Sequence, residues 1–393
     1  MFTLEILKNN NTPKEIDLFL LNHDNGSFFQ SKEWAIFNKN YFNRDSFFIV
    51  IKDKKEIKLV GLILVNKISS RYNYFYCPAG PIYDFEDNEV FEFFVKEIKK
   101  IAKKENAIFL RIEPRIKYSN IESNNLNSFN SLYKTFIKNA GFKVSNEQKQ
   151  PETTIQINLE KNTEEELLKQ MKEKGRYNIK NAQKNNIQIK KTNCNQEDID
   201  AFYKLTKETT QRDGFFSNDK DYYECLLKTF REENKDSIFL YSALVNQEII
   251  ASAIAIFLGN KVIYYYGAST SNEVYRRFSA SYLLQWEIIK DAKKMNYKYY
   301  DFLGISPRID EMNNRFYIFE GLNKHEFNRI EDAEKFLQNH KFYGITQFKK
   351  RFGGYPVSYP GAIDKIYSPV LYTFLNIFKT IRKTIRKILK VRI

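Results

Sequence analysis

The sequence has few cysteines and histidines, which limits the chemistry open to it. Its three cysteines, Cys77, Cys194 and Cys225, are odd in number and far apart, so they predict neither a disulfide framework nor a zinc knuckle. None of the three histidines stands at metal-ligand spacing from another. We therefore expect no metal site and a reducing, cytoplasmic compartment.

Long apolar runs and the common phosphate-binding motifs are also missing. No apolar stretch reaches ~18 residues, so no membrane span is predicted. The first residues lack the basic-then-apolar pattern of a signal peptide. The chain contains no Walker-type loop, Rossmann fingerprint, HExxH or G-x-S-x-G motif. Metal, hydride and serine-nucleophile chemistry are therefore disfavoured, and we expect no cofactor.

Positive charge, in contrast, is present in excess. The 63 Lys and Arg residues outnumber the 48 Asp and Glu residues, which gives a formal net charge of +15. This balance favours contact with a polyanion, either nucleic acid or an anionic membrane surface. Much of the excess follows Asp364, where no acid occurs and the basic residues are Lys365, Lys379, Arg382, Lys383, Arg386, Lys387, Lys390 and Arg392.

The predicted elements come in the same order in both halves of the chain. The first half predicts strands at 45–51, 58–68 and 71–77, a helix at 89–104 and a strand at 107–112. The second predicts strands at 237–245, 249–258 and 261–267, a helix at 280–294 and a strand at 297–303. Further helices are expected at 164–185 and 197–211, and a loop or an insertion at 119–130. This order predicts a mixed α+β fold of two similar units.

Two basic stretches stand out between these elements. One is a helix around Arg176 and Tyr177, and the other is the segment 343–354, in which Phe348 and Phe352 flank Lys349 and its basic neighbours. For each, the alternative interpretation is a basic surface in contact with water.

Seven short motifs, in order along most of the chain, resemble those of the FemABX family. These enzymes are aminoacyl-tRNA-dependent transferases that build peptidoglycan peptide bridges. The matching segments are Phe29–Trp34 (FQSKEW), Ala79–Asp84 (AGPIYD), Leu110–Pro114 (LRIEP, with Glu for the usual Asp), Pro151–Leu159 (PETTIQINL), Arg176–Ile179 (RYNI), Tyr300–Ile305 (YDFLGI) and Phe348–Gly354 (FKKRFGG).

The resemblance implies a fold and a domain plan. It implies two tandem GNAT-like domains, at 1–150 and 151–350, in a compact member that lacks the family's coiled-coil arm. Residues 351–393 are then a C-terminal segment that returns towards domain one and ends in a basic amphipathic helix. Acyl-CoA is disfavoured as the donor, because residues 276–281 lack the glycines that let a backbone approach pyrophosphate.

The resemblance also implies catalytic residues. Lys349 is the expected cation that stabilises the oxyanion formed when an amine attacks the ester carbonyl of aminoacyl-tRNA. Glu113 is the expected base for the attacking ammonium, or alternatively a residue that only holds its loop.

Substrate-binding residues are implied as well. They are Tyr222, Tyr264, Tyr266, Trp34, Lys39 and Asn218. Two cationic diphosphate-binding positions of compact members correspond to Asn38 and Asn218 here, and Lys39 stands next to the first. Period-two alternation predicts Tyr264 and Tyr266 on one strand face and Tyr265 on the other. The alternative for the tyrosines is an ordinary core position.

The C-terminal residues have amphipathic spacing. Apolar residues recur three or four apart at Phe374, Ile377, Ile381, Ile385, Ile388 and Leu389. Such a helix suits peripheral contact with an anionic membrane through residues 374–393. The alternative is a terminal helix packed on domain one.

These observations predict an enzyme with two macromolecular partners. We expect transfer of an amino acid from aminoacyl-tRNA to an amine of a peptidoglycan precursor, either lipid II or UDP-MurNAc-pentapeptide. The protein would be cytoplasmic, or peripheral at the inner face of the membrane. The alternatives are a GNAT-like N-acyltransferase with another donor, and a non-catalytic basic protein that binds tRNA or membrane.

Overall fold

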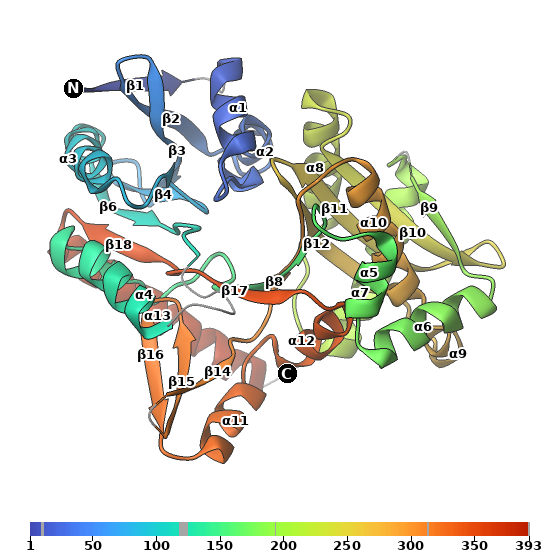
Figure 1. Cartoon of the computed structure of the whole chain (residues 1–393). Coiled ribbons are helices and arrows are strands. Elements are labelled where there is room, and N and C mark those ends of the chain that lie inside the picture. The colour runs from blue at the N-terminus through green and yellow to red at the C-terminus, as the bar shows by residue number, and fades with distance from the viewer. Residues whose placement is uncertain (9–11, 118–124, 193, 313, 392–393) are drawn as a thin grey trace.

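Two helix-covered β-sheets lie side by side and form the body of the protein (Figure 1). The computed structural model describes residues 1–8, 12–117, 125–192, 194–312 and 314–391. The expected mixed α/β architecture is confirmed, and the order of three strands, a helix and a strand occurs in both sheets. The domain boundaries at 150 and 350 stay a prediction.

The first sheet is mostly antiparallel. Its strand order is β1 (Phe2–Lys8), β2 (Asp45–Asp53), β3 (Glu56–Lys67), β4 (Asn73–Cys77), β6 (Ala107–Ile112), β18 (Ile363–Ile366) and β7 (Lys143–Val144), with β5 (Ile82–Tyr83) paired to β3. Its helical segments are α1 (Lys14–Asn22), η1 (Phe28–Gln30), α2 (Lys32–Phe42), α3 (Asn88–Lys104), α4 (Asn125–Tyr133) and η2 (Lys134–Asn139). The expected apolar face of α3 is buried, because Val90, Phe94 and Ile98 recur at helical spacing against the sheet.

The second sheet has the same design. Its strand order is β17 (Tyr355–Ser358), β8 (Thr153–Asn158), β13 (Tyr299–Gly304), β12 (Lys261–Ser269), β11 (Glu248–Leu258), β10 (Ile238–Val245) and β9 (Gln188–Lys191). Its helical segments are α5 (Glu164–Gln170), α6 (Glu173–Lys184), α7 (Gln196–Asp213), α8 (Lys220–Glu233), α9 (Glu273–Arg277), α10 (Ala280–Lys294), α12 (Tyr343–Lys349) and η3 (Lys350–Phe352). The parallel pairing of β12 with β13 ends at Ile263 and Asp301, and no further pairs join these two strands towards Gly304.

The remaining elements lie below the two sheets in Figure 1. A small sheet of β14 (Ile309–Met312), β15 (Arg315–Glu320) and β16 (Asn323–Phe327) is followed by α11 (Ile330–Gln338). Phe319 of this sheet contacts Phe129 of α4, with ring centroids 5.1 Å apart, so the small sheet packs on the first unit. The last helix is α13 (Pro369–Val391), and none of the described helices is both long and apolar enough to cross a membrane.

Two predictions of local structure were wrong. The single helix expected at 164–185 is two helices, because the chain turns at Met171 and the Lys172 amide donates to the carbonyl of Arg351 (3.1 Å). Gly175 allows this close approach, since a Cβ there would lie 2.4 Å from the same carbonyl oxygen. The loop expected at 119–130 contains the start of α4 from Asn125, and residues 119–124 lie outside the described residues.

Aromatic packing joins the two sheets. Phe28 and Trp34 of the first unit contact Tyr265 of β12, with ring centroids 5.1 and 6.4 Å apart. The C-terminal segment makes a second connection, because β17 pairs in the second sheet and β18 in the first. Aromatic packing and the shared C-terminal segment therefore hold the two units together.

Candidate active site

Lys349 is the last residue of α12, and its buried side chain reaches Gly304 at the end of β13. Only 6% of it is exposed, and its Nζ donates to the carbonyl of Gly304 (2.7 Å). Burial lowers the pKa of Lys349 to about 7, and the negative charge of Asp301 opposes this shift. Among the described residues it forms no ion pair. A cation in a dry surrounding acts strongly on a nearby oxyanion, since Coulomb energy grows as the effective dielectric falls.

Asp301 is the carboxylate whose charge acts on Lys349, and hydrogen bonds hold it in place. It accepts hydrogen bonds from the amide of Gln156 (2.9 Å), the backbone N–H of Leu303 (2.7 Å) and the hydroxyl of Thr154. Leu303 has a φ of 59°, a left-handed conformation that is costly for leucine. Strain of this kind is found at functional sites, where the surrounding structure maintains it.

A pocket of about 280 Å³ is lined by Phe348, the neighbour of Lys349. Its lining includes Tyr264, Tyr282 and Arg276. Residues 276–281 run from the end of α9 into the N-terminus of α10, and Ser279 has a φ of 62° there. Tyr264 lines this pocket, and the Lys349 Nζ lies 5.9 Å from the centroid of its ring.

The tyrosines of β12 do not alternate as predicted. Ala255 is opposite Tyr264 and Ile254 is opposite Tyr266, so Tyr265 is the extra residue of a β-bulge. Tyr264 therefore faces the core under α10, whereas Tyr265 and Tyr266 both face the first unit, with ring centroids 4.4 Å apart. The prediction that Tyr264 and Tyr266 share one face was wrong.

Tyr222, Tyr266 and Asn218 form one hydrogen-bonded group between the units. The hydroxyl of Tyr266 donates to that of Tyr222 (3.0 Å) and accepts from the Asn218 amide (3.2 Å). Tyr222 is buried on α8, where the ring of Phe37 from α2 meets it edge-on at 5.1 Å. Three of the expected substrate-binding residues are thus brought together, while Tyr264 belongs to the Lys349 group.

Glu113 belongs to a separate, fully hydrogen-bonded group. Its Oε2 accepts from the Tyr76 hydroxyl (2.5 Å), and its Oε1 accepts from the backbone N–H groups of Lys149 (2.7 Å) and Gln150 (3.1 Å). Burial raises the pKa of Glu113, and these hydrogen bonds oppose the shift. The Glu113 carboxyl therefore connects the end of β6 to the segment at Lys149 and Gln150, which leads from the first unit to the second.

Trp34 and Lys39, both on α2, lie in contrasting places. Trp34 is 7% exposed within the aromatic core, and its indole Nε1 has no hydrogen-bond partner in the part of the chain that the structure describes. Lys39 lies on the surface of the first unit and pairs with Asp45 (2.8 Å). Asn38 is buried and donates to the carbonyl of Trp34 (2.9 Å), so its amide stabilises α2 from within the core.

Arg44 is a cation that sequence reasoning did not single out. Its guanidinium donates to Asn38 Oδ1 (3.2 Å) and lies 4.0 Å from the ring centroid of Phe42. Burial lowers the pKa of Arg44, and the titratable groups that act on it are the hydroxyls of Tyr74, Tyr76 and Tyr222. It forms no ion pair with a described residue. No motif marks this position, because the burial of Arg44 arises only in the fold.

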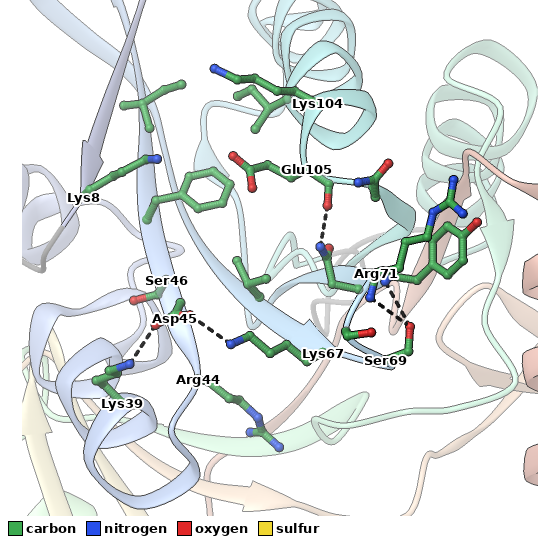
Figure 2. A pocket seen from close by; sticks show the side chains of 18 residues that line it. Lys8, Lys39, Arg44, Asp45, Ser46, Lys67, Ser69, Arg71, Lys104 and Glu105 are labelled. Carbon is green, nitrogen blue, oxygen red and sulfur yellow. Dashed lines mark hydrogen bonds and ion pairs between the residues drawn. The ribbon is translucent and has the colours of Figure 1, made fainter.

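Arg44 also lines a basic hollow of about 1080 Å³ on the first unit (Figure 2). Figure 2 shows Lys39 and Lys67 directed towards Asp45, which neutralises part of their charge. The cations of this hollow are Lys8, Lys39, Arg44, Lys67, Arg71 and Lys104, and its acids are Asp45 and Glu105. The excess of cations favours a phosphate-rich ligand.

The basic helix around Arg176 adds no side chain to the Lys349 group or to the group of Tyr222, Tyr266 and Asn218. Arg176 donates to the carbonyl of Met171 and so closes the turn between α5 and α6, while Tyr177 is exposed. Within the described residues, no cluster of His, Cys, Asp and Glu could hold a metal ion.

Comparisons with known proteins agree with this architecture. A model of the FemAB family matches residues 11–247 and 241–380. A lipid II:glycine glycyltransferase of Staphylococcus epidermidis is 24% identical over 429 residues, which cover 93% of this chain and 94% of that protein. One from Staphylococcus aureus is 24% identical over 434 residues, with coverage of 93% and 94%. A crystal structure of FemX superposes with a TM-score of 0.72 at 21% identity, covering 94% of this chain and 99% of that one.

The likeness to FemX establishes the fold, in which two α/β units, each built on one large β-sheet, lie in one chain. Because the family model matches most of the sequence, the chain belongs to the FemAB family. It is accordingly an enzyme of the acyltransferase class.

Proposed function

We propose that this enzyme transfers an amino acid from aminoacyl-tRNA to an amine of a peptidoglycan stem peptide and so builds the interpeptide bridge. Membership of the FemAB family and the relatives named lipid II:glycine glycyltransferase support the reaction class. The observation that carries the proposal is Lys349, a buried lysine without an ion-pair partner among the described residues.

Lys349 would act on the ester carbonyl of the donor. The acceptor amine attacks this carbon, a C–N bond forms, and the carbonyl oxygen becomes an oxyanion. Lys349 Nζ donates one N–H to the carbonyl of Gly304, and its other two N–H groups can donate to the oxyanion. The C–O bond to the tRNA ribose then breaks, and the released ribose oxygen takes up a proton. One donor of this kind lowers a barrier by roughly 3–4 kcal/mol in other enzymes.

Glu113 fits a positioning role better than the role of a base. Both its oxygens already accept hydrogen bonds, and two of the three donors are backbone N–H groups of the link between the units. We therefore infer that a phosphate group of the substrate accepts the proton of the attacking ammonium. Glu113 then holds in place the segment at Lys149 and Gln150 that links the two units.

Arg44 and the tyrosine group would bind the acceptor. The guanidinium of Arg44, which has no ion-pair partner among the described residues, suits the diphosphate of a muropeptide precursor better than the neutralised Lys39 does. The pocket beside Tyr264 would take the 3′ end of the donor, with Arg276 near its phosphates. With lipid II as the acceptor, the reaction occurs at the inner face of the membrane.

The decisive experiment offers labelled aminoacyl-tRNA with lipid II, with UDP-MurNAc-pentapeptide, or with no acceptor. We expect labelled peptide product with one of the acceptors, and tRNA affinity that falls as salt rises. Lys349→Met should abolish product, whereas Lys350→Met, the matched control on the exposed neighbour, should retain it. Product from acetyl-CoA but none from aminoacyl-tRNA would refute the proposal and favour another GNAT-like acyltransferase.

A further inference from the structure

The C-terminal helix α13 is attached to the first unit by one of its faces. The hydroxyl of Tyr372 donates to Asp364 of β18 (2.7 Å), and its ring meets that of Phe109 with centroids 5.1 Å apart. Lys379, two turns further on, pairs with Glu147 (2.9 Å). The helix is therefore held against the protein along this face, as the packed-helix interpretation expects.

The opposite face of α13 is apolar and uncovered. At ~100° per residue, its large apolar side chains fall in one stripe on roughly the other side of the helix from Tyr372 and Lys379. The members of this apolar stripe are 50–67% exposed: Val370, Phe374, Ile377, Phe378, Ile381 and Ile385. Exposed apolar side chains gathered on one helix face mark an interaction site.

The charge around the apolar stripe indicates its partner. No acid follows Asp364, and eight basic residues do, among them the exposed Arg382 next to Ile381. Two copies of α13 brought together stripe to stripe would place these like charges against one another. An anionic lipid surface instead offers apolar tails to the stripe and negative headgroups to the basic residues.

We propose that α13 lies flat on an anionic lipid bilayer, with the apolar stripe at the boundary between headgroups and acyl chains. The contacts of Tyr372 and Lys379 keep the catalytic units attached to the helix, so the enzyme takes one orientation at the surface. This proposal depends only on α13, and it holds for any activity of the two units.

Vesicle co-sedimentation of the full-length protein tests the proposal. With vesicles of phosphatidylcholine and phosphatidylglycerol we expect binding that weakens as salt rises, and at least ~10-fold weaker binding to pure phosphatidylcholine. Phe374→Ser with Ile381→Ser should weaken binding to the anionic vesicles by about tenfold or more. The matched control is Leu18→Ser with Ile330→Ser, which alters two comparably exposed apolar side chains on α1 and α11 and should change nothing.

Two outcomes would overturn the proposal. The first is unchanged binding of the Phe374→Ser, Ile381→Ser variant to anionic vesicles, and the second is a wild-type dimer that the same substitutions dissociate. Arg382→Glu provides an independent variant that leaves the apolar stripe intact, and it should weaken anionic binding without altering the weak binding to phosphatidylcholine. Thermal melts of all variants should match the wild type, because the substituted side chains are exposed.

Discussion

Replacing Lys349 by methionine should stabilise the protein while it removes activity. In the folded protein the pKa of Lys349 falls from 10.5 to about 7 because the side chain is buried. At ~1.4 kcal/mol per pKa unit, keeping the ammonium buried below pH 7 costs on the order of 4–5 kcal/mol. Methionine loses the hydrogen bond to Gly304, which offsets about 1–2 kcal/mol of this gain. We therefore expect Lys349→Met to raise the free energy of unfolding by ~2–4 kcal/mol near pH 7.

The pH dependence gives this prediction a second signature. Because the folded pKa is the lower one, the unfolded chain binds more protons between pH 7 and 10.5, so the contribution of Lys349 to stability rises with pH across that window. The difference in stability between Lys349→Met and wild type should shrink as pH rises towards 10. Turnover at saturating substrates should fall ~100-fold or more in the variant.

Urea denaturation at several pH values, followed by circular dichroism, measures the difference, with Lys350→Met as the control on the exposed neighbour. A Lys349→Met protein that is less stable than wild type at pH 7, with a difference that does not depend on pH, would refute the reasoning. It would mean that the lysine is solvated or paired in solution, and its proposed action on an oxyanion would lose its electrostatic basis.

Three further substitutions test other parts of the structure. Arg111→Leu leaves the buried Asp364 without its bidentate partner and should cost roughly 3–5 kcal/mol in urea denaturation, and a smaller loss would show that water reaches this pair. Gly267→Ala would place a Cβ 1.6 Å from the Tyr264 hydroxyl, so the ring must move; we expect lower turnover with little change in melting temperature, and normal turnover would remove Tyr264 from the site. Tyr266→Phe removes the hydroxyl that links Asn218 to Tyr222 and should cost about 1 kcal/mol while raising the KM for the acceptor, with an unchanged KM counting against acceptor binding there.

The sequence predicted local elements well and long-range geometry poorly. Strand 107–112 and helix 280–294 match β6 and α10, because buried strands and amphipathic helices carry their own periodic pattern. The bulge at Tyr265 was not predicted, since it depends on how β12 pairs with β11 rather than on the composition of β12. The turn at Met171 was missed for a similar reason, because its partner is Arg351, far away in the chain.

In the candidate site, too, the sequence pointed to single residues but not to their arrangement in space. Lys349 could be singled out from its motif, and its separation from Glu113 into a different hydrogen-bonded group follows only from the fold. Arg44 carries no sequence signal, because its burial beside Tyr74, Tyr76 and Tyr222 arises only in the fold.

The position of β18 has a consequence for the way the chain is made. β18 fills the gap between β6 and β7, and its Asp364 is 253 positions beyond Arg111, the residue it neutralises. On the ribosome, at ~5–20 residues per second, the nascent first unit would wait on the order of ten seconds or more for this strand. The half that is synthesised first is therefore the half that is completed last. Until then, β6 exposes an unpaired edge that a chaperone must shield or that another nascent chain can capture.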